Sequence, residues 1–374
     1  MSELRRELES DRERRRFGTG WLSGTAALIL AVIGLGTMLC LRYPDLLTVP
    51  DAREFYNVGV IRLALHLVLI TAFALGAVSI VLRETKVLGF SAMALVLAAA
   101  VLGGSRAQES VNIETDVYFG LDWFLLNLIL TGIIFVPLER LFRLREQPIF
   151  RVEWREDLFY FFVSSLLVQG LTYLSMAPSM AILKHADAWS TLRGWVASQP
   201  VVVQFFEIMF FTDLVQYWMH RAFHRFSWLW HFHAVHHSAQ SMDWIAGSRM
   251  HFFEIVVLRG LTIIPTYALG FSEPAMYAYI FFVYLFSTFV HSNLRWTFGP
   301  LSTWFVTPRF HHWHHGIERE AIDVNFAVHF PILDRIFGTY YLPSDGKWPS
   351  GYGIKGPMPK GFLRQFLYPF TRRS

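Results

Sequence analysis

Histidines gathered in three short clusters are the residues of this sequence best placed to do chemistry. Of fifteen histidines in the chain, thirteen fall between His220 and His329. Imidazole binds transition metals in its neutral form and is the commonest metal ligand in proteins. The clusters read HRAFH, HAVHH and HHWHH, and their candidate metal ligands are His220, His224, His233, His236, His237, His311, His314 and His315.

The spacing within each cluster predicts metal binding from a helix. Residues three or four apart share one helical face, so each cluster can direct two or three ring nitrogens at one point. Eight convergent imidazoles exceed what a single metal ion coordinates, which indicates two metal ions held side by side. None of the clusters reads HExxH, so a single zinc ion with an adjacent glutamate base is poorly supported.

Other polar residues are expected near the clusters. His251 and His291 each stand at the boundary of a predicted membrane span, at the depth of the clusters, and we count both as metal ligands. Asp213 lies inside a predicted span, where a charge is costly and usually has a role. We expect Asp213, Gln216 and Asn325 to orient the metal-ligating histidines without binding the metal themselves. We assign no catalytic residue beyond the metal ligands.

The composition is that of a membrane protein, with 53% hydrophobic and 17% aromatic residues and a mean hydropathy of +0.35. A helix needs roughly 20 apolar residues to cross a bilayer. The predicted fold is an all-α polytopic membrane bundle with a cytoplasmic histidine-rich cap that holds a dinuclear metal site. The predicted spans lie near residues 20–41, 58–82, 87–104, 122–138, 157–177, 200–219, 252–270 and 274–290.

Charge distribution predicts the orientation of these spans. Arginines crowd the first 16 residues and the segment 139–155, whereas the loop 105–121 is acidic, with Glu109 and Glu114. Because Lys and Arg stay in the cytoplasm, an internal N-terminus and eight spans place all three clusters on the cytoplasmic side. The expected division is a basic cytoplasmic head (1–19), N-terminal transmembrane helices (20–140), a core with the histidines (141–342) and a Gly/Pro-rich cytoplasmic tail (343–374).

Two classes of protein are disfavoured by composition. The single cysteine, Cys40, lies in the first predicted span, so the chain can form no intrachain disulfide and no thiolate metal site. The sequence pI is about 9.2. The basic residues flank apolar spans instead of forming a groove with aromatic side chains, which favours attraction to anionic lipid over binding to nucleic acid.

A series of segments in this sequence resembles the fatty acid hydroxylase/sterol desaturase superfamily of integral-membrane diiron enzymes. The segments are HRAFHR, WLWHFHAVHHS, AGSRMHFFE, TPRFHHWHHG and NFAVHFPILDRIFGTYYLP, and the resemblance covers roughly residues 205–342. His220 and His224 match the first histidine box of that family. The second box corresponds to His233, His236 and His237, and the last to His311, His314 and His315. His251 matches a family histidine that proline usually follows, whereas Phe252 follows it here.

The resemblance implies that two non-haem iron ions activate O2 and that one oxygen enters a lipid C–H bond, or two hydrogens leave. It also implies an external electron donor, such as a reductase, cytochrome, ferredoxin or pterin. The sequence leaves the choice between hydroxylation and desaturation open, together with the identity of the lipid. A membrane metal transporter or metal-binding protein, and a membrane hydrolase with two zinc ions, are the alternative functions.

Overall fold

The computed structural model describes residues 3–10, 12–108, 116–183 and 189–371 of the chain. Within these ranges the structure is helical, with two isolated β-bridges and no strand, which confirms the predicted all-α class. The α-helices are α1 (Glu3–Leu8), α2 (Trp21–Arg42), α3 (Pro44–Leu47), α4 (Pro50–Arg53), α5 (Val58–Leu82), α6 (Val87–Val101), α7 (Leu121–Leu141), α8 (Trp154–Leu166), α9 (Val168–Leu183), α10 (Ser190–Ala197), α11 (Val201–Arg225), α12 (Ser227–His237), α13 (Phe252–Leu269), α14 (Glu273–His291), α15 (Pro308–His314), α16 (Ile332–Ile336) and α17 (Phe362–Thr371).

Short 3₁₀ turns connect some of these helices. They are η1 (Arg12–Arg15), η2 (Gly104–Arg106), η4 (Ala246–Ser248), η5 (Gly299–Thr303) and η6 (Arg319–Ala321).

The chain divides into two compact units. The first comprises Met1–Ile129 with Ser165–Gln169, and the second comprises Leu130–Ser164 with Gly170–Ser374. In the first unit, α2, α5 and α6 pack together through a core that includes many alanines, which let membrane helices approach closely. The four expected segments of the chain, from basic head to cytoplasmic tail, stay a prediction.

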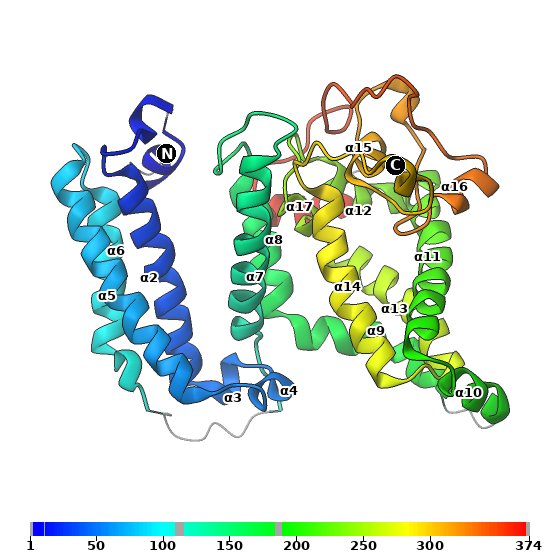
Figure 1. Ribbon diagram of the computed structural model, residues 1–374, viewed down its shortest axis with the longest axis horizontal. Coiled ribbons are helices and arrows are strands. Elements are labelled where there is room, and N and C mark those ends of the chain that lie inside the picture. The colour runs from blue at the N-terminus through cyan, green and yellow to red at the C-terminus, as the bar shows by residue number, and fades with distance from the viewer. Residues whose placement is uncertain (1–2, 11, 109–115, 184–188, 372–374) are drawn as a thin grey trace. The chain divides into compact units, whose positions relative to one another are not determined.

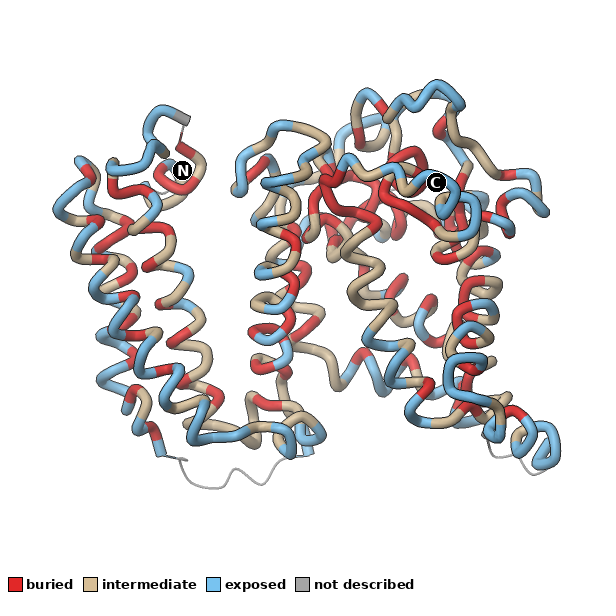
Figure 2. Tube along the Cα trace, viewed as in Figure 1, coloured by how far each residue is buried: buried red, intermediate tan, exposed pale blue. Residues whose placement is uncertain are grey.

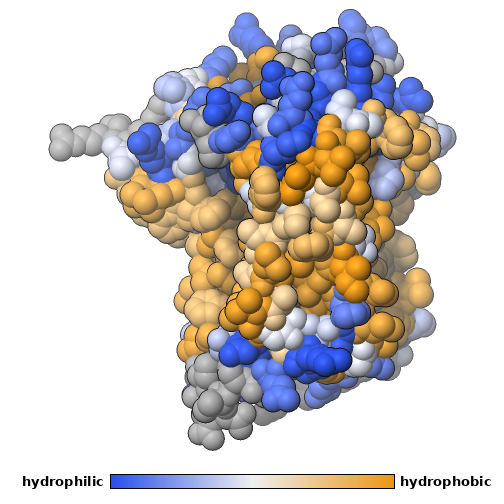
Figure 3. Space-filling model, turned by 90° about the vertical axis from the view of Figure 1, so that its left-hand side faces the viewer, coloured by the Kyte–Doolittle hydropathy of each residue, from blue (hydrophilic) through white to orange (hydrophobic). Residues whose placement is uncertain are grey.

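In the described part of the chain, six helices are long and apolar enough to cross a membrane. They are Trp21–Arg42, Val58–Leu82, Val87–Arg106, Leu121–Leu141, Phe252–Leu269 and Glu273–His291. Apolar side chains form a band between polar ends on the face shown in Figure 3. Six of the eight predicted spans are therefore single helices, and the acidic residues 109–115 lie outside the described residues.

The other two predicted spans belong to bent helix pairs. The span expected at 157–177 is α8 followed by α9, with a bend of 68° between them. The span expected at 200–219 is the first part of α11, which α10 precedes at 120°. By length and composition the bundle therefore has six spans, or up to eight if each bent pair is counted as one.

The second unit carries all three histidine clusters at one end of its bundle. Helices α11 and α14 lead to this end, where α12, α15 and α17 lie (Figure 1). Buried positions gather here as well (Figure 2). Tyr217 of α11, Val290 of α14, Phe310 of α15, Phe326 and Leu333 share one buried apolar cluster that joins these elements. The ends of the long helices and the cap above them are therefore packed as one body.

Candidate metal centre

A sharp corner between α11 and α12 brings the first two histidine clusters together. Phe226 has an extended backbone (φ −98°, ψ 120°) between the two helices, so the helical pattern breaks there and the chain turns. Phe223 and Leu229, on either side of the corner, pack with Phe232 and with Leu258 of α13. This apolar packing fixes the angle at which α12 faces the end of α11.

The third cluster lies on the short helix α15. The Thr307 hydroxyl accepts a hydrogen bond from the backbone N–H of Phe310, and Pro308 occupies the first turn, as is usual at a helix N-terminus. His291 is the last residue of α14, which packs against α15. Two further elements therefore bring imidazoles to the end of the bundle where α11 and α12 meet.

Nine of the ten predicted ligands fall into two groups of buried imidazoles. Within each group, one candidate ligand atom per residue lies within 4.8 Å of all the others. The five-histidine group comprises His220, His224, His233, His237 and His314, and the four-histidine group comprises His236, His291, His311 and His315.

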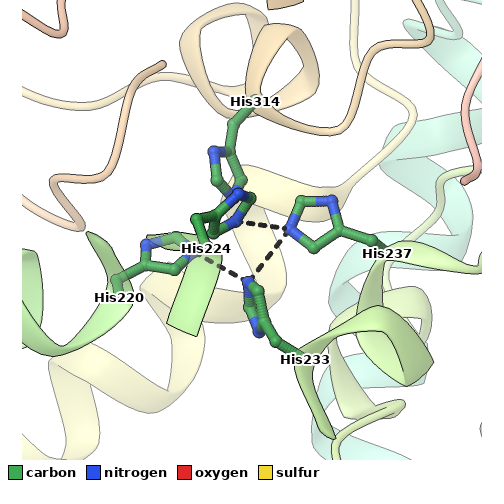
Figure 4. Close-up of side chains that lie close together, drawn as sticks. All are labelled: His220, His224, His233, His237 and His314. Atoms are coloured by element: carbon green, nitrogen blue, oxygen red, sulfur yellow. Dashed lines mark hydrogen bonds between the residues drawn. The ribbon is translucent and has the colours of Figure 1, made fainter. Parts of the chain in front are cut away.

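In the five-histidine group the ring nitrogens face a common centre (Figure 4). The Nε2 atom of His233 lies 3.0 Å from Nε2 of His220 and 3.0 Å from Nε2 of His237. In the four-histidine group, Nε2 of His311 lies 2.9 Å from Nε2 of His291 and 3.2 Å from Nε2 of His315. Nitrogen lone pairs gathered this closely are typical of a site that is completed by a cation.

Hydrogen bonds behind the rings fix which nitrogen faces each centre. The Nδ1 atoms of His220, His314, His236 and His291 donate to the carbonyl oxygens of Phe326 (2.9 Å), Val324 (2.7 Å), Arg249 (3.1 Å) and Ser287 (2.7 Å). Nδ1 of His224 lies 3.2 Å from a carboxylate oxygen of Asp323, and Nδ1 of His233 lies 2.5 Å from one of Glu254. A proton held on Nδ1 leaves the Nε2 lone pair free to bind metal.

The segment 323–326 supplies three of these acceptors, and buried polar side chains hold it in place. The Asp334 carboxylate accepts the backbone N–H groups of Phe326 and Ala327 at 2.7 and 2.9 Å. The Asn325 side chain donates to the carbonyl oxygens of Phe310 and Tyr341 at 3.0 and 2.7 Å. Asn325, one of the predicted orienting residues, thus acts through the backbone and contacts no ligand imidazole.

Asp213 has a similar place. Its carboxylate accepts three backbone N–H groups, those of Val328 (2.7 Å), His329 (3.0 Å) and Phe330 (2.7 Å), and so ties α11 to the chain that follows Phe326. It holds the backbone of an incoming segment, where a histidine side chain was expected. Gln216, the third predicted orienting residue, is half-buried and hydrogen-bonds no histidine among the described residues.

Glu254 is the buried carboxylate closest to the candidate ligands. It is fully buried in the first turn of α13, and one oxygen lies 2.5 Å from Nδ1 of His233. Its other oxygen has no hydrogen-bond partner, and in the described chain its ion pairing is confined to His233. A buried carboxylate needs a compensating positive charge, and a cation bound at Nε2 of His233 would supply it.

Arg249 and Gly247 support the four-histidine group, and sequence reasoning missed both. Arg249 is fully buried and pairs with Asp157 and with Glu153, while its carbonyl accepts from His236. A Cβ at Gly247 would lie 2.7 Å from Nδ1 of His291, so only glycine lets that ring sit there. Both residues lie in the segment AGSRMH, from which we used only His251.

Arg151 has a structural role as well. We used the arginines of 139–155 only to predict which side of the membrane this segment occupies. Arg151 is buried, 2.6 Å from Asp157 and 2.5 Å from Asp243. The same buried ionic network thus includes Asp157, the partner of Arg249.

His251 stands apart from both groups. Its Nδ1 accepts the backbone N–H of Phe253 at 3.1 Å, and its Nε2 donates to the carbonyl of Phe366 in α17 at 3.0 Å. Both ring nitrogens are thereby engaged with the backbone. His312, which belongs to neither group, is fully buried and hydrogen-bonds the hydroxyl of Tyr352 at 2.8 Å.

Burial keeps the candidate ligands in the neutral form that binds metal. Desolvation, and then the proximity of other imidazoles, lowers the pKa well below the ordinary value for the six that lie outside the long helices, namely His233, His236, His237, His311, His314 and His315. At neutral pH these rings are therefore uncharged and competent as ligands.

The donor set fits transition-metal ions. Both groups are built from imidazole alone, a ligand that suits iron, zinc, copper and nickel. Nε2 of His314 is buried and has no hydrogen-bond partner, as expected for a lone pair reserved for a cation. Adjacent imidazole groups at the end of an apolar helical bundle define a membrane protein with a candidate dinuclear metal centre.

Comparison with known proteins finds similarity over part of the chain. Residues 205–339 match the fatty acid hydroxylase family. The ornithine lipid hydroxylase OlsE of Rhizobium tropici is 33% identical over 181 residues, which is 48% of this chain and 54% of that protein. The human alkylglycerol monooxygenase is 33% identical over 148 residues, 39% of this chain and 32% of that protein.

A putative methylsterol monooxygenase of Dictyostelium discoideum is 28% identical over 212 residues, 55% of this chain and 75% of that protein. The matches to OlsE and to the alkylglycerol monooxygenase span about half and about a third of those proteins. No solved structure matches the chain.

Proposed function

We propose that this chain is a membrane-bound oxygenase that uses two iron ions and O2 to hydroxylate or desaturate a C–H bond of a lipid. The observation that carries the proposal is the pair of adjacent imidazole groups at one end of an apolar bundle, within the segment that matches the fatty acid hydroxylase family. The names of the relatives, an ornithine lipid hydroxylase and an alkylglycerol monooxygenase, support a substrate that is a membrane lipid.

In this proposal the nine grouped histidines hold the two ions, and His251 is left out of the set. When bound, the iron supplies the one-electron chemistry needed to activate dioxygen. Five and four imidazoles leave room in an octahedral shell for ligands that the protein does not provide. Glu254 and the carbonyls of segment 323–326 hold the ligand tautomers, and the apolar side chains of α11, α13 and α14 exclude water from the substrate chain.

The reaction also needs electrons, which we assign to a separate reductase, cytochrome, ferredoxin or pterin. The orientation belongs to the same proposal. Arginines before α2 and between α7 and α8 favour a cytoplasmic position for the metal centre and the N-terminus. On that side the metals and the reductant are both available.

Untargeted lipid mass spectrometry of cells that express the chain tests the function. Wild type should convert a host lipid to a product that is heavier by one oxygen or lighter by two hydrogens. His237→Ala and His315→Ala, one change in each histidine group, should abolish the product. His66→Ala is the control, because His66 lies on α5, outside both groups.

Elemental analysis of the same purified proteins supplies the second readout. Active wild-type protein should contain close to two iron ions per chain. Product formation by both group variants would contradict the assignment of the site. Active protein with one ion or none would contradict the dinuclear centre, and active protein loaded with zinc alone would favour a hydrolase.

A further inference from the structure

The C-terminal helix α17 exposes a stripe of large apolar side chains. Leu363, Leu367 and Phe370 are 66%, 45% and 65% exposed. Their spacing of four and three residues puts them on one face of the helix. Leaving such a stripe in water forfeits the stabilisation that burial of large apolar side chains brings.

Other positions of α17 are firmly packed on the second unit. Tyr368 is buried with Tyr160 of α8 and with Ala234 and Val235 of α12. The Phe366 ring stacks on His251 at 4.9 Å between centroids, and the Phe366 carbonyl accepts from His251 Nε2. The exposed stripe is therefore not the result of a loose helix, because these contacts fix the orientation of α17.

The contact through His251 sets the level of α17 along the bundle. His251 is the N-terminal cap of α13, a candidate membrane span that begins at Phe252. The helix α17 lies across the direction of α14 and α11, beside the end that carries α12 (Figure 1). A helix that lies at the start of a span and across the direction of the bundle lies where a bilayer surface would run.

The stripe continues onto neighbouring aromatic residues. Phe370 contacts Phe232, which in turn contacts Phe253, with ring centroids 5.6 and 4.4 Å apart. Phe253 neighbours Trp228, which is 58% exposed. Exposed aromatic residues at the end of a span are typical of the membrane–water interface. We name this surface, made of Trp228, Phe253, Leu363, Leu367 and Phe370, the aromatic shelf.

We infer that the aromatic shelf is a lipid-binding surface that lies in the bilayer interface, with α17 in the membrane plane and its apolar stripe among the acyl chains. Arg364, exposed beside the stripe, is placed to contact anionic headgroups. The occupant is thus a phospholipid surface. The inference rests on the candidate spans and on α17 and does not depend on the proposed chemistry.

The consequence concerns the metal centre. Helix α12, which carries His233, His236 and His237, packs against α17 on one side and carries Trp228 of the shelf in its first turn. Insertion of the shelf would hold three candidate ligands at a constant depth relative to the lipid. A lipid chain would then reach the site from a fixed level of the bilayer.

Site-directed spin labelling of the full chain tests the depth of α17. In a Cys40→Ser background, single cysteines replace Leu363 or Leu367, and Ser344, an exposed residue of the tail, is the control position. The protein is reconstituted in vesicles of phosphatidylcholine with phosphatidylglycerol. Collision of the nitroxide with O2, which concentrates in lipid, is compared with collision with a water-soluble nickel chelate.

We expect the ratio of O2 to nickel collisions at positions 363 and 367 to exceed the ratio at 344 several-fold. Nickel access equal to that at position 344 would overturn the inference by placing α17 in water. Loss of access to both reagents would also overturn it, because protein and not lipid would then cover the stripe. The readout needs neither metal nor turnover, so its failure is distinct from a failure of the proposed oxygenase.

Discussion

Replacement of Glu254 should weaken metal binding in one histidine group and leave the other intact. Glu254 is fully buried and lies 2.5 Å from Nδ1 of His233, which belongs to the five-histidine group. Glu254→Gln keeps an oxygen that can accept from Nδ1 but removes the negative charge. Glu254→Leu removes both, so that the His233 tautomer is no longer fixed and a buried N–H is left without an acceptor.

The structure ranks these two variants. Loss of an outer partner of a metal-bound histidine typically costs about 10- to 100-fold in metal affinity. The short contact and complete burial of Glu254 place the leucine variant near the upper limit, about 2.7 kcal/mol, since each tenfold change is about 1.4 kcal/mol. The glutamine variant should lie near the lower limit, about 1.4 kcal/mol, because only the charge contribution is lost.

Anaerobic competition with chelators of increasing strength measures the effect, with iron counted per chain at each step. Wild type should lose both ions together at the strongest chelator, while Glu254→Leu should fall from two ions towards one at a weaker chelator. Glu207→Gln is the control, since Glu207 lies on α11 and hydrogen-bonds no histidine among the described residues. Equal retention in Glu254→Leu and wild type would refute the orienting role, and equal losses in the Gln and Leu variants would refute the ranking.

Three further outcomes are expected. His251→Gln should retain the wild-type iron content, because the backbone engages both nitrogens of His251; loss of one ion in elemental analysis would return His251 to the ligand set. Asp213→Ala should lower the free energy of unfolding of the metal-free protein by about 1.5–3 kcal/mol for each charge-assisted hydrogen bond that water does not replace. Unfolding of the protein in detergent measures this change, and unchanged stability would contradict the role of Asp213. Burial lowers the pKa of His329 to about 3, so only the unfolded chain binds a proton at this residue as the pH falls below about 6.5. The metal-free protein should therefore lose about 2 kcal/mol of stability from His329 between pH 6.5 and 5. His329→Phe should show a shallower loss of thermal stability over that range, and a pH dependence identical to that of wild type would contradict this role.

The sequence was sufficient to predict the class of fold and the nine histidines that gather, although the predicted set also included His251. Both depend on local periodicity. Apolar runs long enough to cross a bilayer identify spans, and histidines three or four apart identify shared helical faces. The bends escaped prediction, because the break of 68° between α8 and α9 lies inside a stretch that is apolar enough, taken as a whole, to pass for one span.

The partition of the histidines was not predictable from spacing alone. We expected each cluster to address one point. In the structure, His233 and His237 face one group while His236 faces the other, and His311 and His315 are likewise separated from His314. Residues four apart differ by about 40° around a helix and residues three apart by about 60° in the opposite sense, so α12 and α15 each lie between the two groups. Which of these residues faces which group depends on the angle at which the helices cross, and tertiary packing sets this angle.

The backbone acceptors behind the rings explain why spacing could not identify the supporting residues. Phe326 and Val324 hold His220 and His314 through main-chain carbonyls, so the sequence carries no polar side chain to mark them. What the sequence does carry are Asp213 and Asp334, buried carboxylates that hold this segment by its N–H groups. The candidate ligands on α11 and α15 are therefore oriented only after the segment 323–334 has packed against α11. Since metal affinity depends on oriented, neutral imidazoles, iron loading and the folding of this segment should be one coupled equilibrium, with each stabilising the other.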